Sequence, residues 1–200
     1  MKIEYKNIVL RDMTEADIED DIRWNTIETD WAHWDAPWES EPELLTFDAE
    51  KYRKKELENL AKPLDAVRWG FEIDTKEGIH IGAVNSYMIN FAYEWTPLNR
   101  AKPGERLFRT VGIDICESTL CGKGLGTSAL AAFIRYYIEN GETEIFTQTW
   151  SGNARMVKLA EKLGFEVCDR EVNLRRVRGK DYDGLTFRLN MEKFAEFLGR

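Results

Sequence analysis

A chain of 200 residues is long enough for one domain, and 43% hydrophobic with 32% charged residues is ordinary globular composition. The net charge of −8 argues against a nucleic-acid-binding protein, which needs a basic face to displace counterions. The longest apolar run, residues 129–134, is far shorter than the roughly 20 residues that span a membrane. Residues 1–6 lack a signal-peptide core, and the three cysteines lack metal-ligand spacing. We therefore expect a reduced, cytoplasmic protein with no metal site and no membrane partner.

The first half of the chain predicts a short strand, two helices and a hairpin. Residues 8–10 read as the strand, and the capping-box-like pair Thr14 and Asp17 begins a helix over about 14–28. A second helix is expected over 48–61, and residues 67–73 and 79–89 alternate as two strands around a turn at 75–78. His80, inside the second of these strands, has no expected role. Residues 91–107 form a polar connection that is longer than most.

Four tryptophans and several acidic residues are interleaved over residues 24–38, where Pro37 interrupts any long helix. Ring faces beside carboxylates attract cations, so Trp31, Trp34 and Trp38 are candidates for a wall that receives an amine substrate. The alternative is that the rings pack this segment onto the core, which we expect for at least two of the four.

The second half contains the loop Cys121-Gly122-Lys123-Gly124-Leu125-Gly126-Thr127, between a strand at 108–116 and a helix at 128–140. Backbone N–H groups at such a helix start make a site for a phosphate. A strand at 144–150, a helix from Ala154 to Gly164 and strands at 166–177 and 185–189 follow. This order of elements predicts an α/β fold, a mixed sheet with helices on its faces.

The loop, together with Asn153-Ala154 and the run Glu161-Lys162-Leu163-Gly164-Phe165, resembles the GNAT superfamily of acetyl-CoA-dependent N-acetyltransferases. Gly112-Ile113-Asp114-Ile115 and the terminal hairpin with Gly179-Lys180 look like its Rim-type (RimJ/RimL-like) branch. The resemblance is specific over about 108–190. It implies a GNAT-like fold with a mostly antiparallel sheet in one domain, residues 1–200. Residues 1–107 would form the acceptor side, and 108–190 would bind acetyl-CoA.

The resemblance also implies a donor site, in which the loop holds the coenzyme A diphosphate and the preceding strand pairs with the pantetheine arm. Asn153 would contact that arm, although it is equally well explained as a helix N-cap, and Lys158 would reach phosphate or adenine. The cofactor-binding residues expected on this basis are Asp114, Ile115, Cys116, Gly122, Lys123, Gly124, Leu125, Gly126, Thr127, Asn153 and Lys158.

The implied reaction is direct attack of an amine on the acetyl thioester in a ternary complex, without an acyl-enzyme. Many relatives place a tyrosine acid where this chain has Ala160, and a long polar side chain where it has Cys121. Asp114 is the expected catalytic base, with an exposed strand aspartate as the alternative. Further candidates for the base, which the sequence does not rank, are Glu72, Ser118 and Tyr182.

We therefore predict an N-acetyltransferase whose partner is a small-molecule or peptide amine, and we leave a homodimer open. A catalytically idle acyl-CoA-binding or sensing module is the first alternative. A nucleotide-phosphate binder is a more remote one, because the loop lacks the Lys-Ser/Thr ending of a P-loop.

Overall fold

A computed structural model describes residues 1–199, and this part of the chain contains eight strands and six α-helices. The strands are β1 (Lys2–Tyr5), β2 (Ile8–Arg11), β3 (Gly70–Thr75), β4 (His80–Ile89), β5 (Phe108–Ile115), β6 (Ile145–Trp150), β7 (Phe165–Val177) and β8 (Lys180–Leu189). The helices are α1 (Asp17–Thr26), α2 (Pro37–Leu45), α3 (Ala49–Leu60), α4 (Leu125–Glu139), α5 (Ala154–Lys162) and α6 (Met191–Leu198).

The strands form one sheet in the order β1-β2-β3-β4-β5-β6-β8-β7. The pairs β1–β2, β2–β3, β6–β8 and β7–β8 are antiparallel, whereas β5 and β6 run parallel through Arg109↔Ile145 and Thr110↔Phe146. This mixed, mostly antiparallel sheet confirms the predicted α/β class. None of the helices in the described part of the chain is both long and apolar enough to cross a lipid bilayer.

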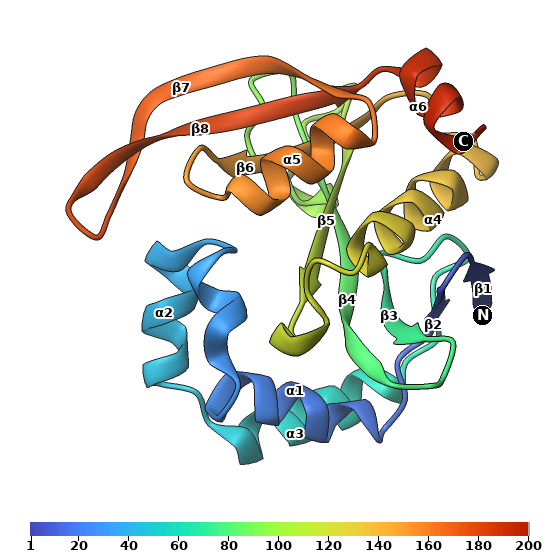
Figure 1. Ribbon diagram of the computed structural model, residues 1–200, viewed down its shortest axis with the longest axis vertical. Coiled ribbons are helices and arrows are strands. Elements are labelled where there is room, and N and C mark those ends of the chain that lie inside the picture. The colour runs from blue at the N-terminus through green and yellow to red at the C-terminus, as the bar shows by residue number, and fades with distance from the viewer. Residues whose placement is uncertain (200) are drawn as a thin grey trace. The chain divides into compact units, whose positions relative to one another are not determined.

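The chain folds into two compact units whose segments alternate along the sequence. The first unit contains Met1–Val84 and Ile113–Ala132, and the second contains Asn85–Gly112 and the described chain from Phe133 onward. In the first unit, buried side chains of β2, β3 and β4, including Ile8, Leu10, Ile73 and Ile81, form the core with the first half of α4. Figure 1 shows α1 and α3 side by side in this unit.

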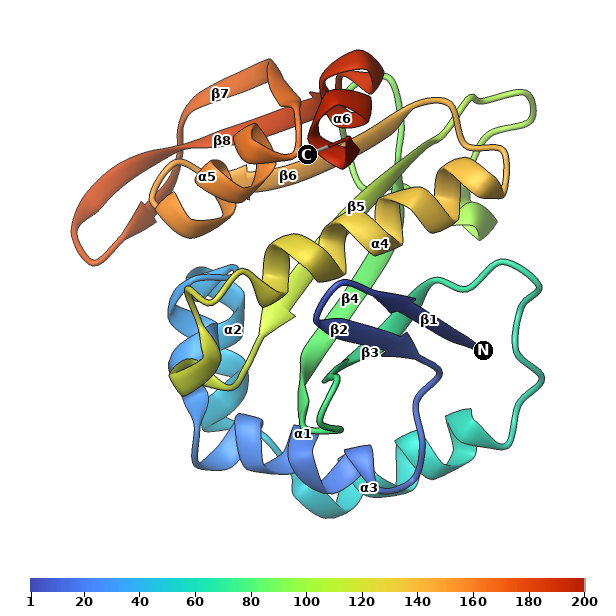
Figure 2. The same cartoon turned by 45° about the vertical axis from the view of Figure 1, so that its right-hand side comes forward.

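The second unit is built on β6, β8 and β7, with α5 beside them (Figure 2). Gly164 has a φ of +91°, and a Cβ added there would lie 2.8 Å from the Cβ of Lys193 at the start of α6. Glycine therefore ends α5, as predicted, and also lets α6 approach closely. Ile89, Phe108 and Phe146 form an apolar cluster within the same unit.

Three elements were not expected from the sequence: β1, α2 and α6. Pro37 interrupts the helical segment, as expected, but it also begins α2, where its missing N–H costs nothing. At α1, both the backbone N–H and the hydroxyl of Thr14 donate to Asp17 Oδ2, at 2.6 and 2.9 Å, so one half of the predicted capping box forms. The N-cap of α1 is Ala16, which makes no side-chain cap bond, so Thr14 does not cap the helix as predicted. The predicted helices at 14–28 and 48–61 and the predicted hairpin form with bounds shifted by a few residues.

Candidate active site

The glycine-rich loop leads into α4, as the sequence predicts, but the helix begins at Leu125, three residues before its predicted start. Gly122 and Gly124 have φ values of +78° and +81°, a region that favours glycine, and a Cβ added at either position would meet no other atom within 4 Å. Ser128 N–H donates to Gly124 C=O at 3.1 Å, which makes Gly124 the residue that accepts the first helical bond. Leu125 and Gly126 therefore occupy the first turn, where the N–H groups have no acceptor within the helix.

Gly126 differs from the other two glycines of the loop. Its φ is not in the left-handed region, and an added Cβ would lie 3.5 Å from Ile115 Cγ1, an ordinary van der Waals distance. Neither backbone strain nor packing therefore requires glycine at this position. A ligand that approaches the backbone closely is a physical reason for it, so the loop fits a bound diphosphate.

The side chains of the loop contribute little charge of their own. Cys121 replaces the long polar residue of many relatives, and its Sγ lies 3.9 Å from the carbonyl oxygen of Ile115 and 3.8 Å from that of Glu117. The thiol thus still ties the loop to the end of β5. Lys123 is exposed and Thr127 is half-buried.

Of the three positions predicted at the end of β5 for the pantetheine arm, two have peptide groups that face β4. Cys116 N–H donates to Ile81 C=O in β4 at 2.9 Å, and the Asp114 carbonyl oxygen lies 2.0 Å from where a Cβ on Gly82 would sit. The peptide groups of Asp114 and Cys116 therefore face β4. Successive residues of a strand turn their peptide groups to opposite edges, so Ile115 presents its N–H and C=O to the other edge of β5.

Asp114 is half-buried on β5. Burial, followed by the negative charge of Asp35, raises the pKa of Asp114 to about 7. A carboxyl group with such a pKa can accept a proton at neutral pH, which a catalytic base must do. The neighbouring Cys116 is buried, and burial together with the charge of Asp114 raises the pKa of its thiol. That thiol stays protonated at neutral pH and is not an activated nucleophile.

Asp35 lies in the tryptophan-rich segment, between a 3-10 helix at Thr29–His33 and α2. Trp24 is the core residue of this group, with 2% of its surface exposed, whereas Trp31, Trp34 and Trp38 are half-buried. Trp31 Nε1 donates to the Trp24 carbonyl at 2.8 Å. The role of the three half-buried rings in binding an amine stays a prediction.

The other candidates for the base have structural partners or lie elsewhere. Glu72 contacts His80 at 2.9 Å, and Ser118 is exposed in a 3-10 helix at Ser118–Leu120. In the second unit, the Tyr182 ring packs edge-on against Trp150, with centroids 4.8 Å apart.

The predicted donor-site residues of the second unit lie at α5. Asn153 is buried, and its Oδ1 accepts a bond from Met156 N–H at 2.9 Å, so it caps the helix. A contact with the pantetheine arm stays a prediction. Lys158 is exposed on α5, and Ala160 is completely buried in the same helix. The position that holds a tyrosine acid in many relatives therefore offers no acid here.

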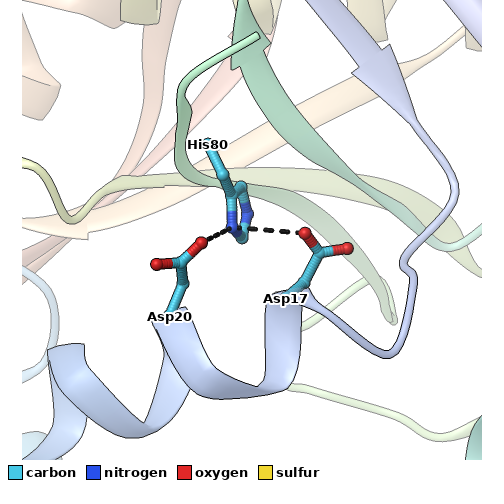
Figure 3. A group of neighbouring side chains, drawn as sticks. All are labelled: Asp17, Asp20 and His80. Atoms are coloured by element: carbon cyan, nitrogen blue, oxygen red, sulfur yellow. Dashed lines mark hydrogen bonds and ion pairs between the residues drawn. The ribbon is translucent and has the colours of Figure 1, made fainter.

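His80, for which we expected no role, lies buried at the centre of a charge cluster (Figure 3). Its Nδ1 lies 3.1 Å from Asp20 Oδ2 and 3.5 Å from Asp17 Oδ1, and its Nε2 lies 2.9 Å from Glu72 Oε2. These side chains come from α1, β3 and β4. No motif marks the cluster, and the acidic residues at the start of α1 were the one signal in the sequence.

Comparison with known proteins places this chain in a family. The family model described as an acetyltransferase (GNAT) domain matches residues 7–166. Among curated protein sequences, none matches the chain.

Solved structures share the fold at low sequence identity. RimL, a ribosomal α-N-protein acetyltransferase in complex with coenzyme A, has a TM-score of 0.69 at 15% identity, over 94% of this chain and 97% of that one. A spermidine N-acetyltransferase SpeG chimera from Vibrio cholerae and hSSAT has a TM-score of 0.63 at 15% identity, over 98% and 100%. YncA from Salmonella typhimurium, a putative acetyltransferase with acetyl-CoA bound, has a TM-score of 0.60 at 18% identity, over 93% and 95%. With the family model covering most of its length, the chain belongs to the GNAT acetyltransferase family, whose members take the acetyl group from acetyl-CoA.

Proposed function

We propose that this protein transfers the acetyl group of acetyl-CoA to a primary amine, by direct attack within a ternary complex. The observation that carries the proposal is the glycine loop at the start of α4, where Gly126 is explained by neither strain nor packing. Two structures of similar fold belong to enzymes named for a ribosomal protein and for spermidine. Both names support an amine acceptor, either a small molecule or a protein N-terminus, and the first supports the Rim-type branch.

When bound, acetyl-CoA supplies an activated thioester. The N–H groups of Leu125 and Gly126, with the α4 dipole behind them, would bind the diphosphate oxygens. The positive φ values of Gly122 and Gly124 give the loop the shape that turns it into the helix. The N–H group of Ile115, which faces away from β4, would donate to the pantetheine arm or to the thioester carbonyl as a one-donor oxyanion site.

On the acceptor side, Asp114 would take the proton that an ammonium group must lose before it attacks. Its pKa of about 7 leaves much of the carboxylate ionised at neutral pH. The charge of Asp35 and the faces of Trp31, Trp34 and Trp38 would attract the cationic acceptor. No side-chain acid is available at Ala160, so the thiolate would leave without protonation from that position.

The test is release of free thiol from acetyl-CoA in the presence of an amine panel that covers polyamines, aminoglycosides and N-terminal peptides. We expect release that depends on one class of amine. Binding of acetyl-CoA without release for any amine would instead identify an idle acyl-CoA-binding module, the second candidate, which the buried Ala160 favours. Saturable binding of ATP or NAD in place of coenzyme A would overturn both.

A further inference from the structure

Both ring nitrogens of His80 face carboxylate oxygens, which fixes the charge of the ring. Nδ1 faces Asp20 and Asp17, and Nε2 faces Glu72, all within 3.5 Å. A neutral imidazole has one N–H, so one of its nitrogens would set a lone pair against a carboxylate. The imidazolium donates at both. Burial alone would lower the pKa of His80, but the bonds to Glu72 and Asp20 and the charge of Asp17 outweigh burial and raise it.

The charges around His80 come from every element packed near it. On α1, Asp17 is also bound by Arg11 of β2 through two contacts of 2.6 Å, and Asp20 by Arg23 at 3.0 Å. Asp21 accepts a bond from Tyr52 of α3 at 2.9 Å. Burial and then the charge of Glu72 raise the pKa of Asp21 to about 7. Within this part of the described chain, His80 is thus the cation that faces Glu72 directly.

The cluster is better explained by its own cations than by a bound metal. The ligand atoms of Asp17, Asp20 and His80 lie within 4.8 Å of one another, as a metal would require. However, an imidazolium has no lone pair to give to a metal, and both oxygens of Asp17 are already bonded to Arg11. Arg11 and His80 therefore supply the positive charge.

Trp24 connects His80 to the residues of the proposed acceptor side. Its ring lies 4.7 Å from the His80 ring, centroid to centroid, and its Nε1 donates to Glu117 Oε1 at 3.2 Å. Its carbonyl accepts the bond from Trp31 Nε1. The Glu117 N–H, like that of Cys116, donates to Ile81, the residue next to His80. Trp24 thus contacts the charge cluster and the segment after β5 through its ring, and the tryptophan segment through its backbone carbonyl.

We propose that His80 is a positioning residue for the acceptor. As an imidazolium it fixes α1 against β3 and β4, and through Trp24 it holds Trp31 and Glu117 in place. Loss of the His80 proton loosens α1 at Asp20, although Arg11 still holds Asp17, and weakens acceptor binding while donor binding persists. This inference rests on the proposed transferase function, but its structural part can be tested without activity.

The first experiment measures the protonation of His80 by NMR. The chain has two histidines, and His33→Gln leaves His80 as the one observed ring. We expect both ring nitrogens to carry protons at neutral pH and the proton to be lost above the usual value of about 6.5. A ring with one N–H at pH 7, or one that titrates below about 6.5, would overturn the proposal.

The second experiment measures KM for the acceptor and for acetyl-CoA against pH. In the wild type the acceptor KM should rise as His80 loses its proton, with KM for acetyl-CoA unchanged. Asp20→Asn keeps the ring but removes one anion, so the rise should move to lower pH. His80→Gln should raise the acceptor KM about tenfold at neutral pH, and His80→Lys should recover part of this loss without the rise. His33→Gln should keep the wild-type transition.

An Asp20→Asn profile that does not move, or a His80→Gln effect of equal size on both substrates, would contradict the positioning role. Hydrogen exchange decides the structural part if no amine is acetylated. His80→Gln should speed exchange in α1 and in residues 29–33, while the β7–β8 hairpin stays unchanged as the internal control. If exchange is faster in His80→Gln but the wild type acetylates no amine, the proposed function alone is rejected. If exchange in His80→Gln equals that of the wild type, the positioning role alone is rejected.

Discussion

The glycine loop and the His80 cluster lie in the same unit, but they are built in different ways. The loop is seven consecutive residues, and its properties follow from two left-handed glycines and the helix start after them. The cluster is assembled from side chains of α1, β3 and β4, with Asp17 and His80 more than sixty residues apart. The loop offers backbone N–H groups to an anion, whereas the cluster and Asp114 present carboxylates. On the proposed function, donor binding would thus be a local property of the backbone, and acceptor binding would depend on tertiary electrostatics.

The largest expected effect comes from replacing Asp114, the proposed catalytic base. Asp114→Asn should lower kcat by roughly 10²- to 10⁴-fold, the usual range for loss of a catalytic base, with KM for acetyl-CoA little changed. In the wild type, the rate should rise as pH increases through about 7, because the base must be ionised to accept a proton. Stopped assays across pH 5.5 to 8 measure both. An Asp114→Asn enzyme with full activity would remove Asp114 from the mechanism.

The next effect tests the loop. Gly126→Glu should raise KM for acetyl-CoA by about 10- to 100-fold, because it sets a negative charge against the diphosphate and occupies the space beside the N–H groups. A glutamate in the first turn of a helix interacts favourably with the helix dipole, so the melting temperature of Gly126→Glu should not fall below that of the wild type.

Gly126→Ala is the matched variant without charge: its Cβ fits at 3.5 Å from Ile115, so the fold tolerates it, but the Cβ stands where the ligand approaches the backbone, so it should raise this KM as well, by less than the glutamate does. Equal KM values for the glutamate variant and the wild type would mean that the loop holds no diphosphate.

A smaller effect tests whether the charge of Asp35 raises the pKa of Asp114. Removing the charge in Asp35→Asn should lower the pKa of Asp114 and move the acidic limb of the rate profile to lower pH, a gain of a few-fold at pH 6. Asp30→Asn, an exposed aspartate in the same segment, should leave the limb where it is. If both variants move the acidic limb of the rate profile equally, the general surface charge, and not Asp35 in particular, raises the pKa of Asp114.

The smallest effect concerns the second unit. Asn153→Ala removes the cap of α5 and should lower the free energy of unfolding by about 1 kcal/mol, whereas Asn153→Asp keeps the cap and most of the stability. Thermal melts measure this difference. A higher KM for acetyl-CoA in the well-folded Asn153→Asp would show that Asn153 contacts the donor as well as the helix.

Local patterns predicted most of the elements. The hairpin of β3 and β4, the helix ending at Gly164 and the loop before α4 follow from alternation, helical spacing and glycine positions, which act within a few residues. The helix α2 was missed because Pro37 reads as a break, although a proline is tolerated in the first turn. Which of Asp114, Ile115 and Cys116 faces away from β4 could not be predicted, because strand pairing decides which edge each peptide group faces, and pantetheine binding at Ile115 stays a prediction.

By itself the sequence determined the glycine loop, the order of most of the elements and the resemblance to the family, because each depends on residues close together in the chain. The tertiary structure decided which carboxylates surround His80, the raised pKa of Asp114 and the contacts of Trp24. Those properties depend on burial and on charges from distant segments, and no local pattern shows which carboxylates will lie beside His80 or Asp114 after folding.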